Sequence, residues 1–159
     1  MKVGKKEHWK LRRRLLPVDF ELYRVLGTGD PWRVLATACL LKVTRKEQFY
    51  PLLEHFFRRY PTPQRLLAGR VAALRRMLFP LGLWRKRAQE LRRIACGLVA
   101  HGPPRSWDEA EALYGVGEYV EDYHAVFVLQ DYSRQPHDYA LKHYWMMVQR
   151  REPRRDLAP

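Results

Sequence analysis

Apolar residues recur at helical spacing along nearly the whole chain, and Pro or Gly interrupts the pattern at short intervals. After Asp30-Pro31, the side chains of Trp32, Leu35 and Leu40 share one helical face, and the pattern is longest from Arg85 to Ala100. A capping residue followed by proline is typical of a helix start. No segment alternates polar and apolar residues with the period of two that indicates a strand. The sequence therefore predicts an all-α fold of short helices.

Capping residues predict where three further helices begin. Thr62-Pro63 repeats the cap-then-proline signal. Thr44 to Glu47 and Ser106 to Glu109 each have the spacing of a capping box, in which the first and fourth residues bond each other's backbone amides. We expect helices to follow all three segments.

Length and composition favour one soluble domain. The chain has 159 residues, of which 47% are hydrophobic, enough for a buried core. No window approaches ~18 consecutive apolar residues, and the basic start lacks the apolar region of a secretory signal. We therefore expect no membrane partner and an intracellular location, in the cytoplasm or nucleoid. Cys39 and Cys96 lie in apolar helical patterns, which predicts buried, reduced thiols.

Charge is unevenly distributed along the chain. The formal net charge is +13, and Arg58 to Arg93 holds eleven basic residues against Glu90 alone. The stretch from Ser106 to Ser133 instead holds seven acidic residues and no Lys or Arg. Such polarity favours a polyanionic partner, with nucleic acid the first candidate. Solvated helix faces are the simpler alternative, which charge alone does not exclude.

Two glycines one residue apart, Gly115 and Gly117, flank Val116 between a helix ending near Leu113 and another starting near Glu118. Glycines permit a tight turn, and amides at a helix start bind phosphate without a basic side chain. An ordinary helix–helix turn also uses glycine, so this segment is informative only together with its neighbours.

Four short motifs follow one another along the chain, separated by longer stretches. They are Asp30-Pro31-Trp32, Pro80-Leu81-Gly82-Leu83-Trp84, Gly115-Val116-Gly117-Glu118-Tyr119 and Pro136-His137-Asp138. In this combination the chain resembles the helix-hairpin-helix DNA glycosylases, of which endonuclease III is the archetype. The resemblance is greatest to the thymine/uracil mismatch glycosylase domain of the methyl-CpG-binding mismatch-repair branch.

The resemblance implies one two-lobed helical domain of the HhH-GPD fold over residues 1–159, with a helix-hairpin-helix motif and a central DNA-binding cleft. Residues 30–119 would form a helical barrel with the hairpin, and residues 12–29 and 121–149 the second lobe. The polar ends, 1–11 and 152–159, are expected to be flexible.

The resemblance also implies that Asp138 is the catalytic carboxylate. Breaking an N-glycosidic bond builds positive charge on the sugar. A fixed carboxylate either stabilises that charge or activates the attacking water. Asp138 also has the position of a helix N-cap, and both roles are compatible. Asp131 is a rival carboxylate, but it follows the hairpin too closely.

Tyr119 occupies the position where members that also cut the backbone carry a lysine, whose amine forms a Schiff base with the sugar. A phenol cannot form an imine, but it can pack against an extruded base. The alternative is a core tyrosine that shares a face with Tyr123, Val126 and Phe127.

The family resemblance suggests that Leu83 is a wedge that enters the base stack when the target base leaves it. The alternative, a cap of the following helix, fits Leu83 equally well. Lys42 matches a second residue that relatives insert near the orphaned base, although a solvated lysine at a helix end is the simpler reading. Arg85, Lys86 and Arg87 follow the wedge, and we expect them to contact DNA phosphates.

The sequence departs from the family pattern in three respects. It has no cysteine after Cys96, so we expect no iron–sulfur cluster and no other cofactor. Tyr114 replaces the usual hairpin proline. Glu118, Glu121 and Asp122 place acids near the expected phosphate, where amides and a monovalent cation held by carbonyls near Tyr114 and Val116 would compensate. No other metal site is expected, because the six histidines have no paired metal-ligand spacing.

These features together predict a monomeric, monofunctional DNA glycosylase acting on double-stranded DNA with a mismatched or damaged base. It would excise thymine, uracil or a 5-substituted uracil opposite guanine by hydrolysing the N-glycosidic bond. Two alternatives remain open. One is a glycosylase of the same fold for adenine or an alkylated or hypermodified base, and the other is a non-catalytic DNA-binding module.

Overall fold

The computed structural model describes residues 25–114 and 117–151. Gly115 and Val116 of the expected hairpin lie outside the described residues, as do the expected flexible ends and residues 12–24 of the expected second lobe. The described part is helical and contains no strand. Its helices are α3 (Pro31–Leu41), α4 (Lys46–Arg59), α5 (Pro63–Ala68), α6 (Val71–Leu78), η1 (Phe79–Leu81), α7 (Trp84–His101), α8 (Trp107–Tyr114), α9 (Glu118–His124), η2 (Ala125–Leu129) and α10 (Tyr139–Arg151). The all-α prediction is confirmed.

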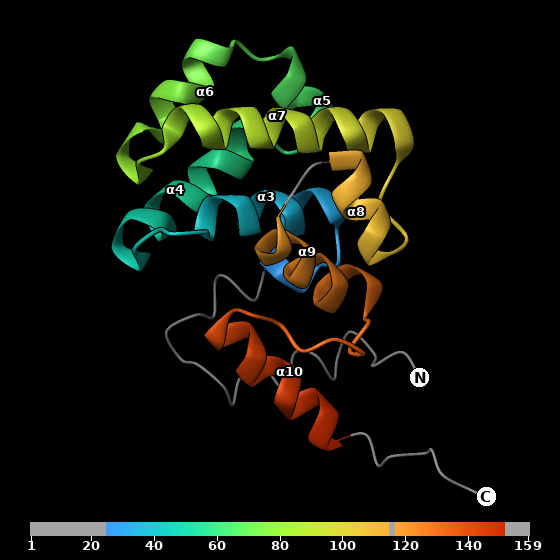
Figure 1. Ribbon diagram of the computed structural model, residues 1–159. Helices are drawn as coiled ribbons and strands as arrows, with labels where there is room; N and C mark the ends of the chain where they lie inside the picture. Colours follow the sequence, from blue (N-terminus) through green and yellow to red (C-terminus); the bar gives the residue numbers. More distant parts are fainter. Residues whose placement is uncertain (1–24, 115–116, 152–159) are drawn as a thin grey trace, which may run out of the picture.

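Helix α3 lies at the centre of the core. Every residue from Val34 to Leu40 is fully buried, as expected for a helix that other helices surround on all sides. The helices α4, α7 and α9 pack against it. In Figure 1, α7 crosses the molecule above α3, and α10 lies below α3 and α9. The start of α10, the end of α3 and the start of α7 all lie toward the left of that view.

Helix capping explains most of the starts that the sequence predicts. The Asp30 side chain accepts a hydrogen bond from the Arg33 amide at 2.8 Å, and the Thr62 hydroxyl accepts one from the Arg65 amide at 3.2 Å. The Ser106 hydroxyl likewise accepts from the Glu109 amide at 3.2 Å. Each side chain satisfies an amide that the first helical turn leaves without a partner.

The capping box predicted at Thr44 is wrong. The N-cap of α4 is Arg45, without a side-chain cap. The Thr44 hydroxyl instead donates to the Leu40 carbonyl at 2.7 Å, because it lies one turn beyond the last residues of α3. Thr44 therefore closes α3 rather than opening α4.

The cysteines differ in burial, which corrects one expectation. Cys39 is buried in α3, whereas Cys96 is exposed on α7. Burial raises the pKa of the Cys39 thiol far above its usual range, and the Glu90 carboxylate, which accepts its hydrogen at 3.4 Å, adds to that effect. Cys39 is therefore a core thiol and not a nucleophile.

None of the described helices is both long and apolar enough to cross a lipid bilayer.

Candidate active site and DNA interface

Asp138 lies immediately before α10 and caps its first turn. Its Oδ2 accepts a hydrogen bond from the Leu141 amide at 3.0 Å and another from the Tyr123 hydroxyl at 3.3 Å. Within the described residues, its Oδ1 accepts no hydrogen bond. The side chain is half-buried. The carboxylate is thus held through one oxygen while the other is available to a ligand.

A row of aromatic rings joins the helix after the hairpin to α10. Tyr119 and Tyr123 on α9 lie 5.1 Å apart between ring centroids, and Phe127 on η2 stacks 5.1 Å from Tyr144 on α10. Tyr123 and Phe127 connect the two pairs at 6.1 Å. The i, i+4 spacing along α9 and η2 produces the row. It fixes α10, and hence Asp138, against the helix that carries Tyr119.

Tyr119 is half-buried, and its hydroxyl donates to the Tyr123 hydroxyl at 3.5 Å. A chain of hydroxyls therefore runs from Tyr119 through Tyr123 to Asp138. Burial, together with the nearby Asp138 carboxylate, raises the pKa of Tyr119 to about 12, although the hydrogen bond with Tyr123 opposes this. Tyr119 is consequently a neutral phenol at physiological pH.

The residue before Asp138 is bound by a buried carboxylate. Asp122 is fully buried, and its Oδ2 accepts the His137 amide at 2.7 Å and lies 3.1 Å from the His137 Nδ1. On the outer side, the Glu118 carboxylate lies 3.7 Å from the His137 Nε2. These contacts hold the backbone directly before Asp138.

The acids near the hairpin do not crowd a phosphate as the sequence suggests. Glu121 and Asp122 are buried, and only Glu118 is exposed. Asp131 also has a structural role. Its two oxygens accept hydrogen bonds from the Ser133 amide at 2.9 Å and from the Trp107 indole N–H at 2.8 Å. Hydrogen bonds from Ser133, and then from Trp107, lower the pKa of Asp131.

Two exposed apolar residues occupy strained turns near the start of α7. Leu83 is 60% exposed with φ 49°, and Val43, between α3 and α4, is 80% exposed with φ 53°. Positive φ is costly for both residue types, most of all for β-branched valine. Strain of about 1–3 kcal/mol per residue persists only where the surroundings impose it, which is typical of functional sites.

Arg87 imposes both turns, which corrects its expected contact with DNA. The side chain is only 3% exposed. Its guanidinium donates to the Gly82 carbonyl at 3.0 Å and, across the core, to the carbonyls of Cys39 (2.8 Å), Leu40 (3.2 Å), Lys42 (2.6 Å) and Val43 (3.4 Å). All five N–H donors of an arginine are used in this way. Arg87 faces inward because it shares a helical face with Leu91 and Ile94.

Lys42 is placed differently from Val43, which the sequence did not single out. Lys42 is the C-cap of α3, and its ammonium lies 3.9 Å from the Glu90 carboxylate. Val43 forms the exposed tip of the turn. Nothing in the local sequence indicates this, because valine is disfavoured at positive φ.

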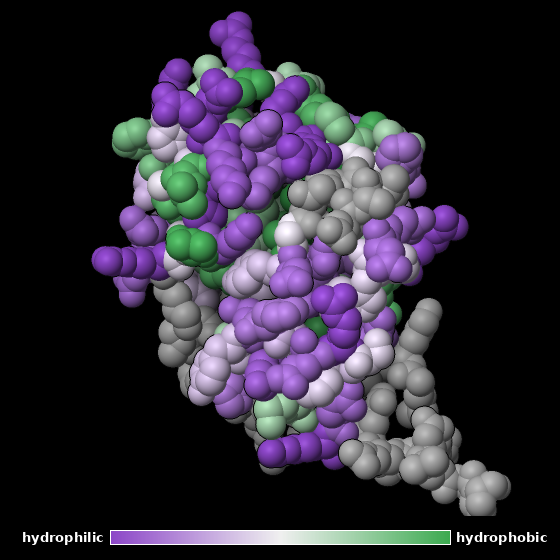
Figure 2. Space-filling view, in the orientation of Figure 1, coloured by the Kyte–Doolittle hydropathy of each residue, from purple (hydrophilic) through white to green (hydrophobic). Residues whose placement is uncertain are grey.

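Arg85 and Lys86 are exposed, as expected for residues that contact phosphates. The Arg85 guanidinium lies over the Trp84 ring, 4.0 Å from its centroid. Figure 2 shows hydrophilic side chains covering α6 and α7, with hydrophobic side chains beside them at the left of the view. An apolar wedge next to a basic surface is the arrangement that insertion into a charged duplex requires.

The hairpin itself is described only from Gly117, which is the N-cap of α9. The expected cation position near Tyr114 and Val116 therefore lies partly outside the described residues. Within the described ranges, no group of three or more His, Cys, Asp or Glu side chains is arranged to hold a metal ion.

Comparison with known proteins identifies relatives by sequence. The chain is 38% identical over 121 residues to the thymine-DNA glycosylase of Aeropyrum pernix, covering 69% of this chain and 52% of the relative. It is 38% identical over 95 residues to the thymine/uracil-DNA glycosylase of Pyrobaculum aerophilum, covering 58% and 41% respectively. The chain is thus similar in sequence to thymine- and uracil-DNA glycosylases, in keeping with its resemblance to the helix-hairpin-helix DNA glycosylases.

Solved structures show the same fold. A thermostable thymine-DNA glycosylase superposes with a TM-score of 0.61 at 23% identity, covering 80% of this chain and 57% of that one. Endonuclease III in a trapped covalent complex with DNA superposes with a TM-score of 0.56 at 19% identity, covering 79% and 61%. No protein-family model matches the chain. The chain spans about half the length of the Aeropyrum pernix relative and less than half of the Pyrobaculum aerophilum relative.

Proposed function

We propose that this chain is a monofunctional DNA glycosylase. It flips thymine, uracil or a 5-substituted uracil opposite guanine out of a duplex and hydrolyses the N-glycosidic bond, and it acts as a monomer. The observation that carries the proposal is the half-buried Asp138 carboxylate, which is fixed through Oδ2 while Oδ1 accepts no hydrogen bond from the described residues. The two relatives named for thymine or uracil glycosylases support the choice of base.

In this proposal Asp138 stabilises the positive charge that develops on the sugar, or activates the attacking water. Tyr119 packs against the extruded base and, through Tyr123, helps to hold the carboxylate. Since Tyr119 is a phenol, no amine attacks the sugar from this position, and the product is an abasic site.

The duplex side of the proposal assigns Leu83 and the turn at Lys42 and Val43 to the space that the flipped base leaves. Both turns are exposed, both carry an apolar side chain, and one buried arginine fixes them to each other. Gly115, Val116 and Gly117 bind the phosphate backbone through their amides. Residues 30–119 and the second lobe of residues 12–29 and 121–149 enclose the cleft.

The test compares the wild type with Asp138→Asn on duplexes that carry thymine, uracil, a 5-substituted uracil, adenine or an alkylated base. Abasic sites are revealed by alkali, and borohydride trapping of parallel samples detects an imine. We expect alkali-sensitive sites without a covalent adduct, and a loss of at least about 100-fold in Asp138→Asn.

Asp108→Asn is the matched control, because it makes the same chemical change at an exposed acid on α8. It should leave turnover unchanged. Equal turnover in Asp138→Asn and the wild type would contradict the assignment of Asp138. If the wild type binds the duplexes but excises none of the bases, the chain is a binding module.

A further inference from the structure

A basic groove lies between α6 and α7, next to the turn that carries Leu83. The groove has a cavity volume of about 610 Å³. Four of its lining residues are cationic, namely Arg75 from α6 and Arg85, Lys86 and Arg92 from α7, and none is acidic. Its remaining lining residues are Val71, Ala88 and Gln89.

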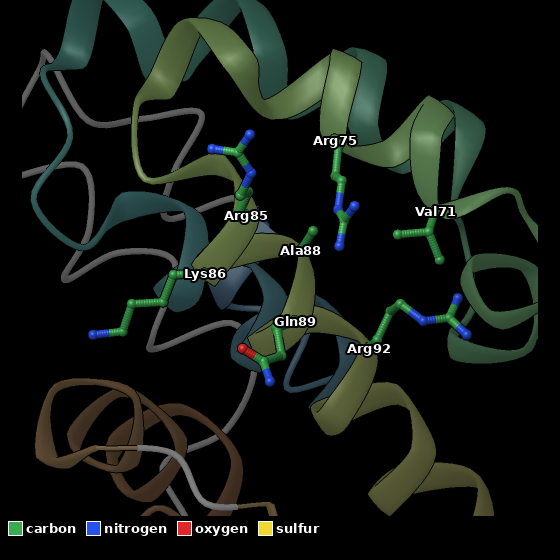
Figure 3. Close-up of a pocket in the computed structure, with 7 residues that line it drawn as sticks. All are labelled: Val71, Arg75, Arg85, Lys86, Ala88, Gln89 and Arg92. Atoms are coloured by element: carbon green, nitrogen blue, oxygen red, sulfur yellow. The ribbon is translucent and has the colours of Figure 1, made fainter.

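The cations are arranged in space as well as in sequence. Figure 3 shows Arg75 extending from α6 between Arg85 and Arg92, whereas Lys86 points away from α6. Arg85 and Arg92 are seven residues apart on one helix, so about 10 Å of α7 separates them. The groove is therefore long enough to contact more than one phosphate of a DNA strand.

The charges of the groove have no counter-charge in the described part of the chain. No ion pair is formed there by Arg75, Arg85, Lys86 or Arg92. Glu90, the one acid on α7, lies instead against Lys42 and Cys39. A depression lined by one sign of charge concentrates ions of the opposite charge.

Two features fit the groove to a phosphodiester backbone rather than to a general anion. Guanidinium groups bind phosphate oxygens through two parallel N–H bonds, and three of the four cations are arginines. The Arg85 guanidinium is also held in place over the Trp84 ring. Trp84 follows Leu83 directly, so a strand that passes the wedge continues toward the groove.

We propose that the α6–α7 groove binds successive phosphates of the duplex arm beyond the wedge, with Arg75 and Arg92 as contacts additional to Arg85 and Lys86. This inference rests on the proposed function, because it assumes that Leu83 marks the position of the flipped base. The groove then acts as a second anchor that fixes which side of the lesion the protein covers.

The experiment measures affinity for an undamaged duplex as a function of salt, so that it does not depend on base excision. Arg75→Gln combined with Arg92→Gln should lower the slope of log affinity against log salt by about 1.8, because about 0.9 is lost per phosphate contact. The matched control is Arg59→Gln combined with Arg65→Gln, which removes two exposed charges outside the groove. The control should change the slope by less than half as much.

A second measurement shortens a mismatched duplex on one side of the mismatch at a time. The wild type and the control should lose affinity when one arm is shortened but not the other, and the groove variant should be insensitive to both. A slope that changes equally in both double variants would overturn the proposal. The proposal would also be overturned if the groove variant lost binding to polyglutamate while its salt slope with DNA was unchanged. That result would indicate an acidic protein as the partner.

The two proposals fail separately. If the groove variant loses its salt slope but the wild type excises no base, the groove binds DNA and the proposed activity is wrong. If the wild type excises bases while the groove variant behaves like the control, the activity stands and the groove is not its DNA contact.

Discussion

At the turns around Leu83 a buried cation binds backbone carbonyls, whereas before Asp138 a buried anion binds a backbone amide. Arg87 donates to carbonyls on both sides of the core, and Asp122 accepts from the amide and ring of His137. Arg87 thereby fixes the turn of the exposed Leu83, and Asp122 fixes the segment before the half-buried Asp138. The proposed reaction uses both Leu83 and Asp138. The turns at Leu83 and Val43 are therefore held by a buried positive charge, and the segment before the Asp138 carboxylate is held by a buried carboxylate.

The two devices differ in how completely they are satisfied. Arg87 uses all of its N–H donors, while the Oδ1 of Asp122 has no hydrogen-bond partner among the described residues. Burial lowers the pKa of Arg87, but a guanidinium remains charged at any physiological pH. Asp122 lies two residues before the buried His124, and burial lowers the pKa of that histidine to about 4. We therefore expect the stability of the turns around Arg87 to be independent of pH, and the region of α9 and the start of α10 to lose stability in mild acid.

The largest expected effect is that of Arg87→Met. The substitution removes the guanidinium donor from five backbone carbonyls, of which only those of Leu40 and Lys42 keep the Thr44 hydroxyl as a side-chain donor. It also removes the contacts that hold Val43 and Leu83 at positive φ. We expect the free energy of unfolding to fall by about 3–4 kcal/mol in urea titrations. Arg87→Lys should lose about 2 kcal/mol, because an ammonium keeps the charge but lacks the planar fork.

Arg85→Met is the matched control, because Arg85 is exposed two residues earlier on the same helix. It should change stability by less than about 0.5 kcal/mol. If Arg87→Met and Arg85→Met destabilise equally, the five hydrogen bonds do not hold the turns, and the comparison between the two devices fails.

Local signals were sufficient for much of the fold. The caps at Asp30, Thr62 and Ser106 act within four residues of themselves, so the sequence alone predicts them correctly. The N-cap position of Asp138 is also confirmed, because its bond to the Leu141 amide is local. The catalytic role of Asp138 remains a prediction.

Arg87 could not be separated from Arg85 by charge alone, because its partners lie up to 48 residues away. Helical spacing was the available signal, since Arg87 recurs with Leu91 and Ile94 on the buried face of α7. The same spacing places Asp122 with Val126. The positive φ of Val43 had no local signal, because distant hydrogen bonds impose it.

Mild acid should destabilise the region of α9 and the start of α10 through His124. Burial lowers the pKa of His124 to about 4, while an unfolded histidine has a pKa of about 6.5. Between these values the unfolded chain binds a proton that the folded chain does not, so stability falls as the pH is lowered from about 6.5 to 4. We expect a loss on the order of 2–3 kcal/mol across that window in urea titrations.

His124→Phe should flatten this dependence, because the buried ring then has no proton to bind. His101→Gln, at an exposed histidine of α7, should not flatten it. Hydrogen exchange at pH 5 distinguishes the two regions directly. Amides of α9 and the segment before α10 should lose protection, and those at the start of α7 should keep it. A uniform loss along the chain would remove the distinction.

The smallest expected change in stability, and the most informative about catalysis, is that of Asp122→Asn. An amide oxygen still accepts the His137 amide, but the negative charge is lost, so we expect a cost of about 1–2 kcal/mol. The segment before Asp138 becomes less strictly placed, and a displacement of the carboxylate by a fraction of an ångström should lower the single-turnover rate about tenfold at saturating DNA. Glu118→Gln is the matched control, because Glu118 lies 3.7 Å from the same imidazole but is exposed, where an ion pair contributes little. Equal rates in the two variants would mean that the buried anion only stabilises the fold, whereas a rate loss confined to Asp122→Asn, with unchanged affinity for DNA, would identify it as the group that positions the carboxylate.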